Sequence, residues 1–159
     1  MLRDTKGQVM SDETDLIKLY SAKILDLAAN IPHSTRLDAP MATVKRRAPL
    51  CGSTVTVDLN IQDGRISDFA QDVKACALGQ AAASVVGAAV VGRSLEQIEA
   101  ARSQLRAMLK DGASAPKAPF DGLAVLEPAR DYKNRHASIM LSLDATAEAF
   151  EQALQSNCA

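Results

Sequence analysis

The chain has 159 residues, of which 47% are hydrophobic and 23% charged, and it contains no tryptophan. This length and composition predict one soluble globular domain and argue against a disordered or membrane-embedded chain. A formal net charge of −1 gives no strong attraction to nucleic acid, and the lack of a signal-like or spanning apolar run predicts a cytoplasmic protein without a membrane partner.

The N-terminal part of the chain predicts a leader and then a helix. Residues 1–10 are expected to be a disordered leader, and residues 11–156 a single domain. Ser11 is a suitable N-cap, and the helical pattern ends at Asn30 and Pro32. The apolar residues that recur at helical spacing between them are Leu16, Leu19, Tyr20, Ile24 and Leu27.

Three strands are predicted next. Residues 43–47 favour a short edge strand, and residues 54–61 alternate strictly between polar and apolar side chains, as a half-buried strand does. Asp63-Gly64 is a strong two-residue turn signal, so residues 65–73 should return antiparallel. A sheet of only three strands needs helices to cover it.

Helices follow the strands. Residues 77–91 are nearly all small or apolar and predict a buried helix. Ser94 and Gln97 form a capping box for a helix that ends at Gly112, and a flexible connection over 113–119 should lead to a short helix around residues 123–126. A last helix carries the apolar stripe Met140, Leu143, Ala147, Phe150 and Leu154. Strands first and helices after predict an α+β fold.

Two cysteines are the strongest candidates for chemistry. Cys51 precedes the best strand and Cys76 follows its hairpin partner, so both should lie at the same end of the sheet. Cys76 also opens a helix, where the macrodipole favours a thiolate. By themselves, two cysteines this far apart are more often small buried hydrophobic residues than metal ligands.

Four motifs resemble those of the U-type iron-sulfur cluster scaffolds, the family of IscU, SufU and the NifU N-terminal domain. They are Leu19-Tyr20 in the first helix, Pro49-Leu50-Cys51-Gly52, the Asp63-Gly64 hairpin, and Ala75-Cys76-Ala77 before a helix rich in alanine. The segment 112–135 is similar in length to the SufU branch, and Tyr132-Lys133-Asn134-Arg135 resembles that branch's lead-in to a third cysteine. The resemblance implies a SufE/IscU-like α+β fold with a small antiparallel three-stranded sheet covered by helices.

The resemblance also implies a site for a transient iron-sulfur cluster or zinc. Cys51 and Cys76 match two of the family's ligands, whereas Ser138 stands at the third cysteine and Ser53 at an aspartate. A serine hydroxyl is a poor ligand near neutral pH, so His136 is expected to act as a surrogate metal ligand. Arg135 is expected to pair with an anionic ligand at the site. The alternatives are that Ser138 is an N-cap, that His136 is a surface or capping residue, and that Arg135 is a solvated charge.

The expected function is therefore cluster assembly rather than enzymatic catalysis. A scaffold of this kind would receive sulfur from a cysteine desulfurase, hold iron through Cys51 and Cys76, and pass the cluster to apo iron-sulfur acceptor proteins. The alternative is a degenerate homologue that acts as a binding or regulatory module without building clusters. The sequence leaves a homo-oligomer open.

Overall fold

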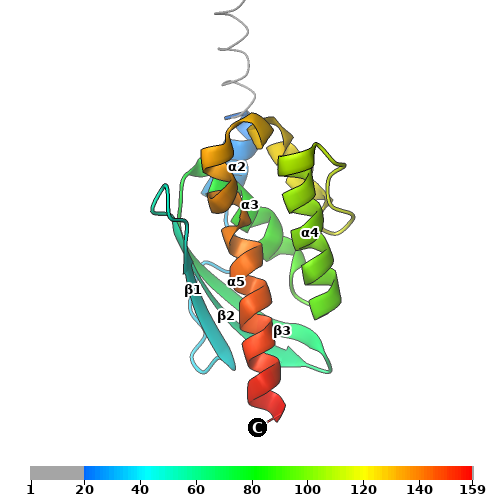
Figure 1. Cartoon of the computed structure of the whole chain (residues 1–159). Coiled ribbons are helices and arrows are strands. Elements are labelled where there is room, and N and C mark those ends of the chain that lie inside the picture. The colour runs from blue at the N-terminus through cyan, green and yellow to red at the C-terminus, as the bar shows by residue number, and fades with distance from the viewer. Residues whose placement is uncertain (1–19, 159) are drawn as a thin grey trace, which may run out of the picture.

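The computed structural model describes residues 20–158, with side chains up to residue 156, so the predicted leader lies outside the described residues. The sheet has the order β1-β2-β3, with both neighbouring pairs antiparallel. Figure 1 shows the helices gathered beside it, which confirms the predicted α+β class. The elements, in chain order, are α2 (Ala22–Ala29), β1 (Ala42–Arg47), β2 (Thr54–Gln62), β3 (Arg65–Lys74), α3 (Ala77–Ala89), α4 (Leu95–Asp111), the 3-10 helix η1 (Asp121–Asp131) and α5 (Lys133–Cys158).

The predicted hairpin joins β2 to β3. Asp63 and Gly64 have φ angles of 55° and 75°, so both are in the left-handed region that a tight two-residue hairpin turn requires. At the far end of the ladder, Thr54 is paired with Lys74. The start of β2 and the end of β3 therefore lie side by side, as the sequence predicted.

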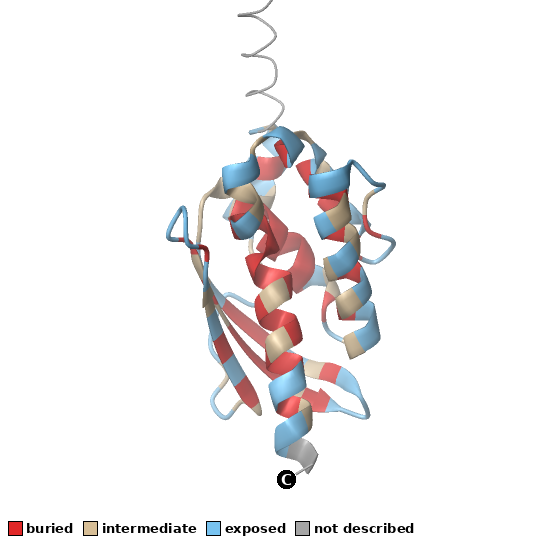
Figure 2. Cartoon of the chain, viewed as in Figure 1, coloured by how far each residue is buried: buried red, intermediate tan, exposed pale blue. Residues whose placement is uncertain are grey.

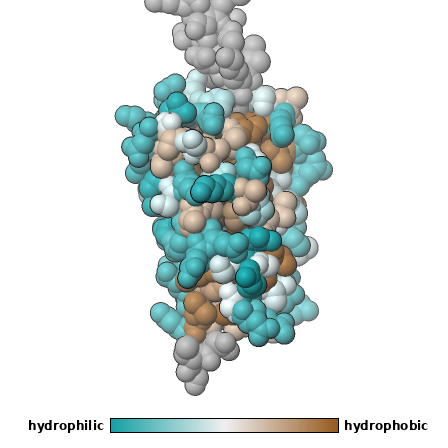
Figure 3. Space-filling view, turned by 90° about the vertical axis from the view of Figure 1, so that its right-hand side faces the viewer, coloured by the Kyte–Doolittle hydropathy of each residue, from teal (hydrophilic) through white to brown (hydrophobic). Residues whose placement is uncertain are grey.

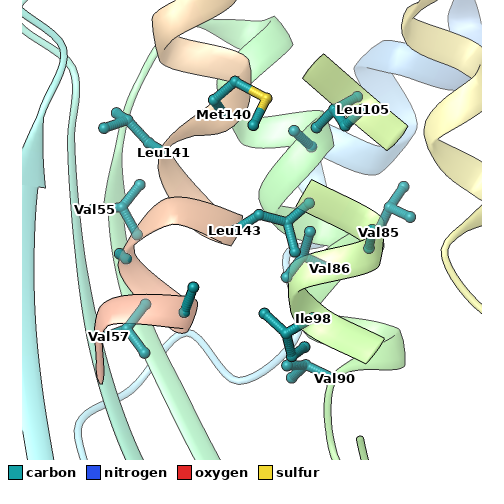
Figure 4. Close-up of a cluster of buried hydrophobic side chains, with 14 of the residues drawn as sticks. Val55, Val57, Val85, Val86, Val90, Ile98, Leu105, Met140, Leu141 and Leu143 are labelled. Atoms are coloured by element: carbon teal, nitrogen blue, oxygen red, sulfur yellow. The ribbon is translucent and has the colours of Figure 1, made fainter. Parts of the chain in front are cut away.

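Helix α5 is the centre of the molecule. It packs along β1 and β2 on one side and against α3 and α4 on the other. Figure 4 shows Leu141 of α5 on the side of Val55 and Val57 in β2, while Met140 and Leu143 turn toward the α3 and α4 side. Helix α3 is almost wholly buried, and α5 is buried along its middle but exposed toward its C-terminal end (Figure 2).

Two helices in the described part of the chain differ from the sequence analysis: the first predicted helix is interrupted at Ser21, and the alternative that Ser138 is an N-cap was wrong. The first described helix begins at Ala22, because Ser21 adopts an extended conformation and its Oγ accepts a hydrogen bond from the Ile24 amide at 3.3 Å. The predicted start at Ser11 lies outside the described residues. The last helix begins at Lys133, so Ser138 lies inside α5 and is not its N-cap.

The other predicted helix signals were confirmed. Ser94 and Gln97 form both hydrogen bonds of a capping box at the start of α4, and Gly112 ends that helix in the left-handed conformation. Between residues 20 and 158, no helix is long and apolar enough to cross a membrane.

Candidate functional site

A loop between β1 and β2 presents Cys51. Arg47 pairs with Thr54 at the end of the ladder, and the Ala48 amide donates to the Ser53 carbonyl at 2.8 Å. The loop turns at Gly52, whose φ of 71° suits glycine, and the Gly52 amide donates to the Ala48 carbonyl. The closed loop holds Cys51 exposed at its tip and places the Ser53 side chain inward, where it is 4% exposed.

Cys76 reaches the same end of the sheet from the other arm of the hairpin. It follows Lys74, the last residue of β3, and it is the N-cap residue of α3. Its backbone is extended, and its side chain makes no capping hydrogen bond. The thiol is therefore free to face the site, in the field of the N-terminus of a buried helix.

A chain of side-chain contacts connects the two thiols. The Cys51 Sγ lies 3.2 Å from the Ser53 Oγ, the Ser138 Oγ donates to the Ser53 Oγ at 3.0 Å, and the Cys76 Sγ lies 3.6 Å from the Ser138 Oγ. The predicted placement of both cysteines at one end of the sheet is thus confirmed. The structure also brings together Ser53 and Ser138, the two serines that the resemblance places at the remaining ligand positions.

The contact between α3 and α5 depends on Gly79, which the sequence analysis missed. A Cβ atom at Gly79 would lie 2.5 Å from the Ser138 Oγ and 2.9 Å from the Ala75 Cβ, closer than carbon side chains can approach. Only glycine lets α3 lie close enough to seat Ser138 beside Cys76. A glycine within an alanine-rich buried helix was the available signal for this close approach.

The environment favours the thiolate form of Cys51. The hydrogen bond from the Ser53 side chain is the main cause that lowers the pKa of Cys51, and Ser138 and the positive charge of Arg135 act in the same direction against the cost of burial. The Ser138 hydroxyl donates to Ser53, so the Ser53 hydroxyl hydrogen is free to point to the Cys51 sulfur. When Cys51 is a thiolate, the Ser53 hydroxyl can therefore donate to its sulfur, which lies 3.2 Å away.

Arg135 and His136 lie on different sides of the first turns of α5. Arg135 is half-buried and close enough to Cys51 for its charge to act on the thiol. His136 precedes the inward-facing Ser138 by two residues, which is about 200° of rotation around a helix. Its Nε2 lies 3.0 Å from the carbonyl oxygens of Ala129 and Arg130 in η1.

The structure therefore does not bring the His136 ring to the cysteine pair, and its role as a metal ligand stays a prediction. Among the described residues, no group of three or more histidine, cysteine, aspartate or glutamate side chains is placed to hold a metal ion. What the site offers is two thiols, two buried hydroxyls and one guanidinium. Such a set binds soft metals or sulfur through the thiols and gains little from the hydroxyls.

Comparisons with known proteins point to one family. The family model described as the NifU-like N terminal domain matches residues 19–138, so the match ends at Ser138. The crystal structure of a nitrogen-fixing NifU-like protein (N-terminal) from Brucella abortus is 42% identical to the chain, with a TM-score of 0.86, and the match covers 89% of this chain and 98% of that one.

Two further relatives have lower identities. The iron-sulfur cluster assembly scaffold protein IscU of Thermotoga maritima is 22% identical over 84% of this chain and 94% of its own length. The crystal structure of a putative iron-sulfur cluster assembly scaffold protein for the SUF system from Fervidobacterium islandicum is 16% identical to the chain, with a TM-score of 0.76. The match covers 84% of this chain and 98% of that one. At that identity the second structure supports the fold alone.

Proposed function

Because the chain belongs to the family of the NifU-like N-terminal domain, which includes iron-sulfur cluster assembly scaffolds, we propose that it is a scaffold that assembles its cargo on Cys51 and Cys76. The observation that supports this most is the contact chain that joins the two thiols through Ser53 and Ser138 at one end of the sheet. Four side chains from three separate parts of the chain meet there.

The two thiolates would hold iron, the nascent cluster or zinc, and the two serines would contribute little. A neutral hydroxyl replaces an anionic donor at both remaining positions, so binding should be weaker than in a site with four anionic ligands. A partner protein can complete the coordination at the exposed Cys51 loop. His136 could do so only after leaving its carbonyl partners in η1.

We assign sulfur acceptance from a cysteine desulfurase to Cys51. Its sulfur is exposed, whereas Cys76 is half-buried, and the Ser53 hydroxyl stabilises the Cys51 thiolate. The Cys51 thiolate would attack the outer sulfur of a persulfide on the desulfurase and form a new sulfur–sulfur bond. The bond between that sulfur and the donor cysteine breaks, and the donor leaves as a thiolate.

In this proposal the protein is a carrier, and the desulfurase releases the sulfur. Two electrons from an external thiol reductant would convert the accepted sulfur to sulfide and release Cys51 as a thiolate, and the assembled cluster would then pass to apo iron-sulfur acceptor proteins. The second candidate is a degenerate homologue that binds partners without building clusters. It is favoured by one observation: Ser138 and Ser53 are 4% or less exposed, and their hydroxyls hydrogen-bond each other.

Anaerobic reconstitution separates the two candidates. The protein would be incubated with ferrous iron, cysteine, a cysteine desulfurase and dithiothreitol as the reductant, desalted, and analysed for iron and acid-labile sulfide. The scaffold proposal predicts both in the wild type and their loss in Cys51→Ala and Cys76→Ala. The third cysteine of the sequence, Cys158, lies 20 positions after Ser138 and is not part of the proposed site, so Cys158→Ala should behave as the wild type. A folded wild type without acid-labile sulfide would establish the degenerate homologue instead.

A further inference from the structure

A cleft of about 710 Å³ lies between α4, η1 and the start of α5. Two contacts hold its walls together. At one end, Asp144 of α5 accepts from Arg102 of α4 at 2.6 Å, and at the other end the His136 ring is fastened to the carbonyls of η1. The residues that line the cleft are Arg106, Leu109, Lys110, Arg130, Asp131, Lys133, His136, Ala137, Met140 and Asp144.

The rim of this cleft is basic although the whole chain has a net charge of −1. Arg106 and Lys110 lie one turn apart on the α4 wall, and Arg130 and Lys133 lie on the wall formed by η1 and α5. Two carboxylates, those of Asp131 and Asp144, also line the cleft. Asp144 is paired with Arg102 at 2.6 Å, outside the lining, and with Arg106, one of the four cations, at 3.7 Å, so the cations of the lining still outnumber its carboxylates. The cleft therefore attracts negative charge from both walls.

The floor of the cleft is apolar and the charges are spread along its length. Leu109 and Met140 are buried, 2% and 6% exposed, and they line the cleft together with the exposed Ala137. The eleven-residue interval from Lys133 to Asp144 corresponds to about 16 Å along a helix axis, enough for about five residues of extended peptide. A compact anion such as phosphate would need donors that converge on one point, whereas cations facing each other along a groove suit a row of carboxylates.

We propose that this cleft binds an acidic peptide segment of a partner protein, with an apolar side chain of that segment seated over Leu109 and Met140. The recognition would be mainly electrostatic. On the face that α4 covers, the surface is largely hydrophilic and its apolar atoms form small separate patches (Figure 3). Such a face offers no broad apolar contact, so the charges would select the partner and a small apolar anchor would fix its register.

The cleft and the cysteine site share one turn of α5. His136 and Ala137 line the cleft, whereas Arg135 and Ser138 face the cysteine site. A segment bound in the cleft would therefore hold its parent protein next to the Cys51 loop. Peptide binding in the cleft requires no bound metal or cluster, because neither the two cysteines nor the two serines of the cysteine site line the cleft.

The test measures peptide binding to the apo protein. The probe is a fluorescein-labelled twelve-residue peptide with leucine at every fourth position and glutamate elsewhere, and the comparison peptide has lysine in place of each glutamate. Fluorescence anisotropy should show saturable binding of the acidic peptide but not of the lysine peptide. The affinity for the acidic peptide should fall as the salt concentration is raised. In ¹⁵N spectra, the acidic peptide should shift the amides of residues 106–110 and 130–144 more than those of the sheet.

A matched pair of double variants identifies the site. Lys110→Glu with Lys133→Glu reverses one charge on each wall and should weaken binding about tenfold or more. Lys23→Glu with Lys45→Glu makes the same change of net charge on exposed residues of α2 and β1 and should leave the affinity within about twofold of wild type. No saturable binding up to millimolar peptide, equal weakening in both double variants, or amide shifts centred outside the cleft would each overturn the proposal.

Discussion

Replacing Ser138 with cysteine should tighten metal binding by about two orders of magnitude. Ser138 is 1% exposed, and its Oγ lies 3.6 Å from the Cys76 Sγ and 3.0 Å from the Ser53 Oγ, so a sulfur there becomes a third thiolate facing the pair. Four-ligand zinc sites bind with about 10–16 kcal/mol, and an even share per ligand is about 2.5–4 kcal/mol. Each 1.4 kcal/mol corresponds to about a tenfold change in affinity. A cysteine sulfur is larger than the serine oxygen and must fit into the narrow space beside Gly79, so we expect a gain at the lower end of the range of about 2.5–4 kcal/mol.

The assay is zinc titration against a chromophoric chelator at pH 7.5, with wild type, Ser138→Cys and Ser142→Cys side by side. Ser142 is a suitable control, because it is equally buried one turn along α5 but bonds to Gln71 and not to a cysteine. The control should bind zinc as the wild type does. An unchanged zinc affinity in folded Ser138→Cys, or an equal gain in Ser142→Cys, would refute the placement of Ser138 among the ligands.

Three further predictions concern the supports of the site and of the sheet. Gly79→Ala should destabilise the protein by about 1–3 kcal/mol in urea unfolding, because the new methyl group overlaps the Ser138 Oγ; unchanged stability would contradict the close approach. Burial raises the pKa of Asp58 in β2, but the hydrogen bonds that its carboxylate accepts, the strongest of them from Arg36, outweigh burial and hold that pKa below its usual 3.8. The ionised carboxylate then stabilises the fold above pH 3.8, and this stabilisation is lost as the pH falls below that value. Asp58→Asn should therefore lower the free energy of unfolding by about 1–3 kcal/mol at pH 7 and by less at pH 3; an equal loss at both pH values would contradict this. Iodoacetamide should modify Cys51 in peptide maps at a lower pH midpoint in wild type than in Ser53→Ala, since the serine hydroxyl stabilises the thiolate; coincident midpoints would remove that role from the hydroxyl.

The sequence was sufficient to predict the framework of the site. The Asp63-Gly64 turn makes β2 and β3 an antiparallel hairpin, whose register shifts once between Asn60 and Ile61. A hairpin places the residues before its first strand and after its second strand at one end of the sheet. Local signals of this kind, including the capping box at Ser94, depend on residues close together in the chain. They therefore predict the positions of Cys51 and Cys76 without knowledge of the tertiary packing.

The remainder of the site depends on how α5 packs, which local signals do not encode. Ser138 and Ser53 are 85 residues apart in sequence, and their hydrogen bond exists only because α3 approaches α5 closely at Gly79. The prediction for His136 assumed that the first helix turn after Arg135 faces the cysteine pair. Because α5 already begins at Lys133, the rotation of about 100° per residue turns His136 away from Ser138 and toward η1.

Cobalt(II) binding tests the central claim most directly, because the intensity of the sulfur-to-cobalt charge-transfer absorption grows with the number of thiolate ligands. The claim is that Cys51 and Cys76 form one two-thiolate site, to which position 138 is adjacent. We predict an absorption of two-thiolate intensity per bound cobalt in the wild type, about half of it in Cys51→Ala or Cys76→Ala, and about one and a half times as much in Ser138→Cys. An absorption that survives unchanged in either cysteine-to-alanine variant, or one that Ser138→Cys does not increase, would contradict the claim.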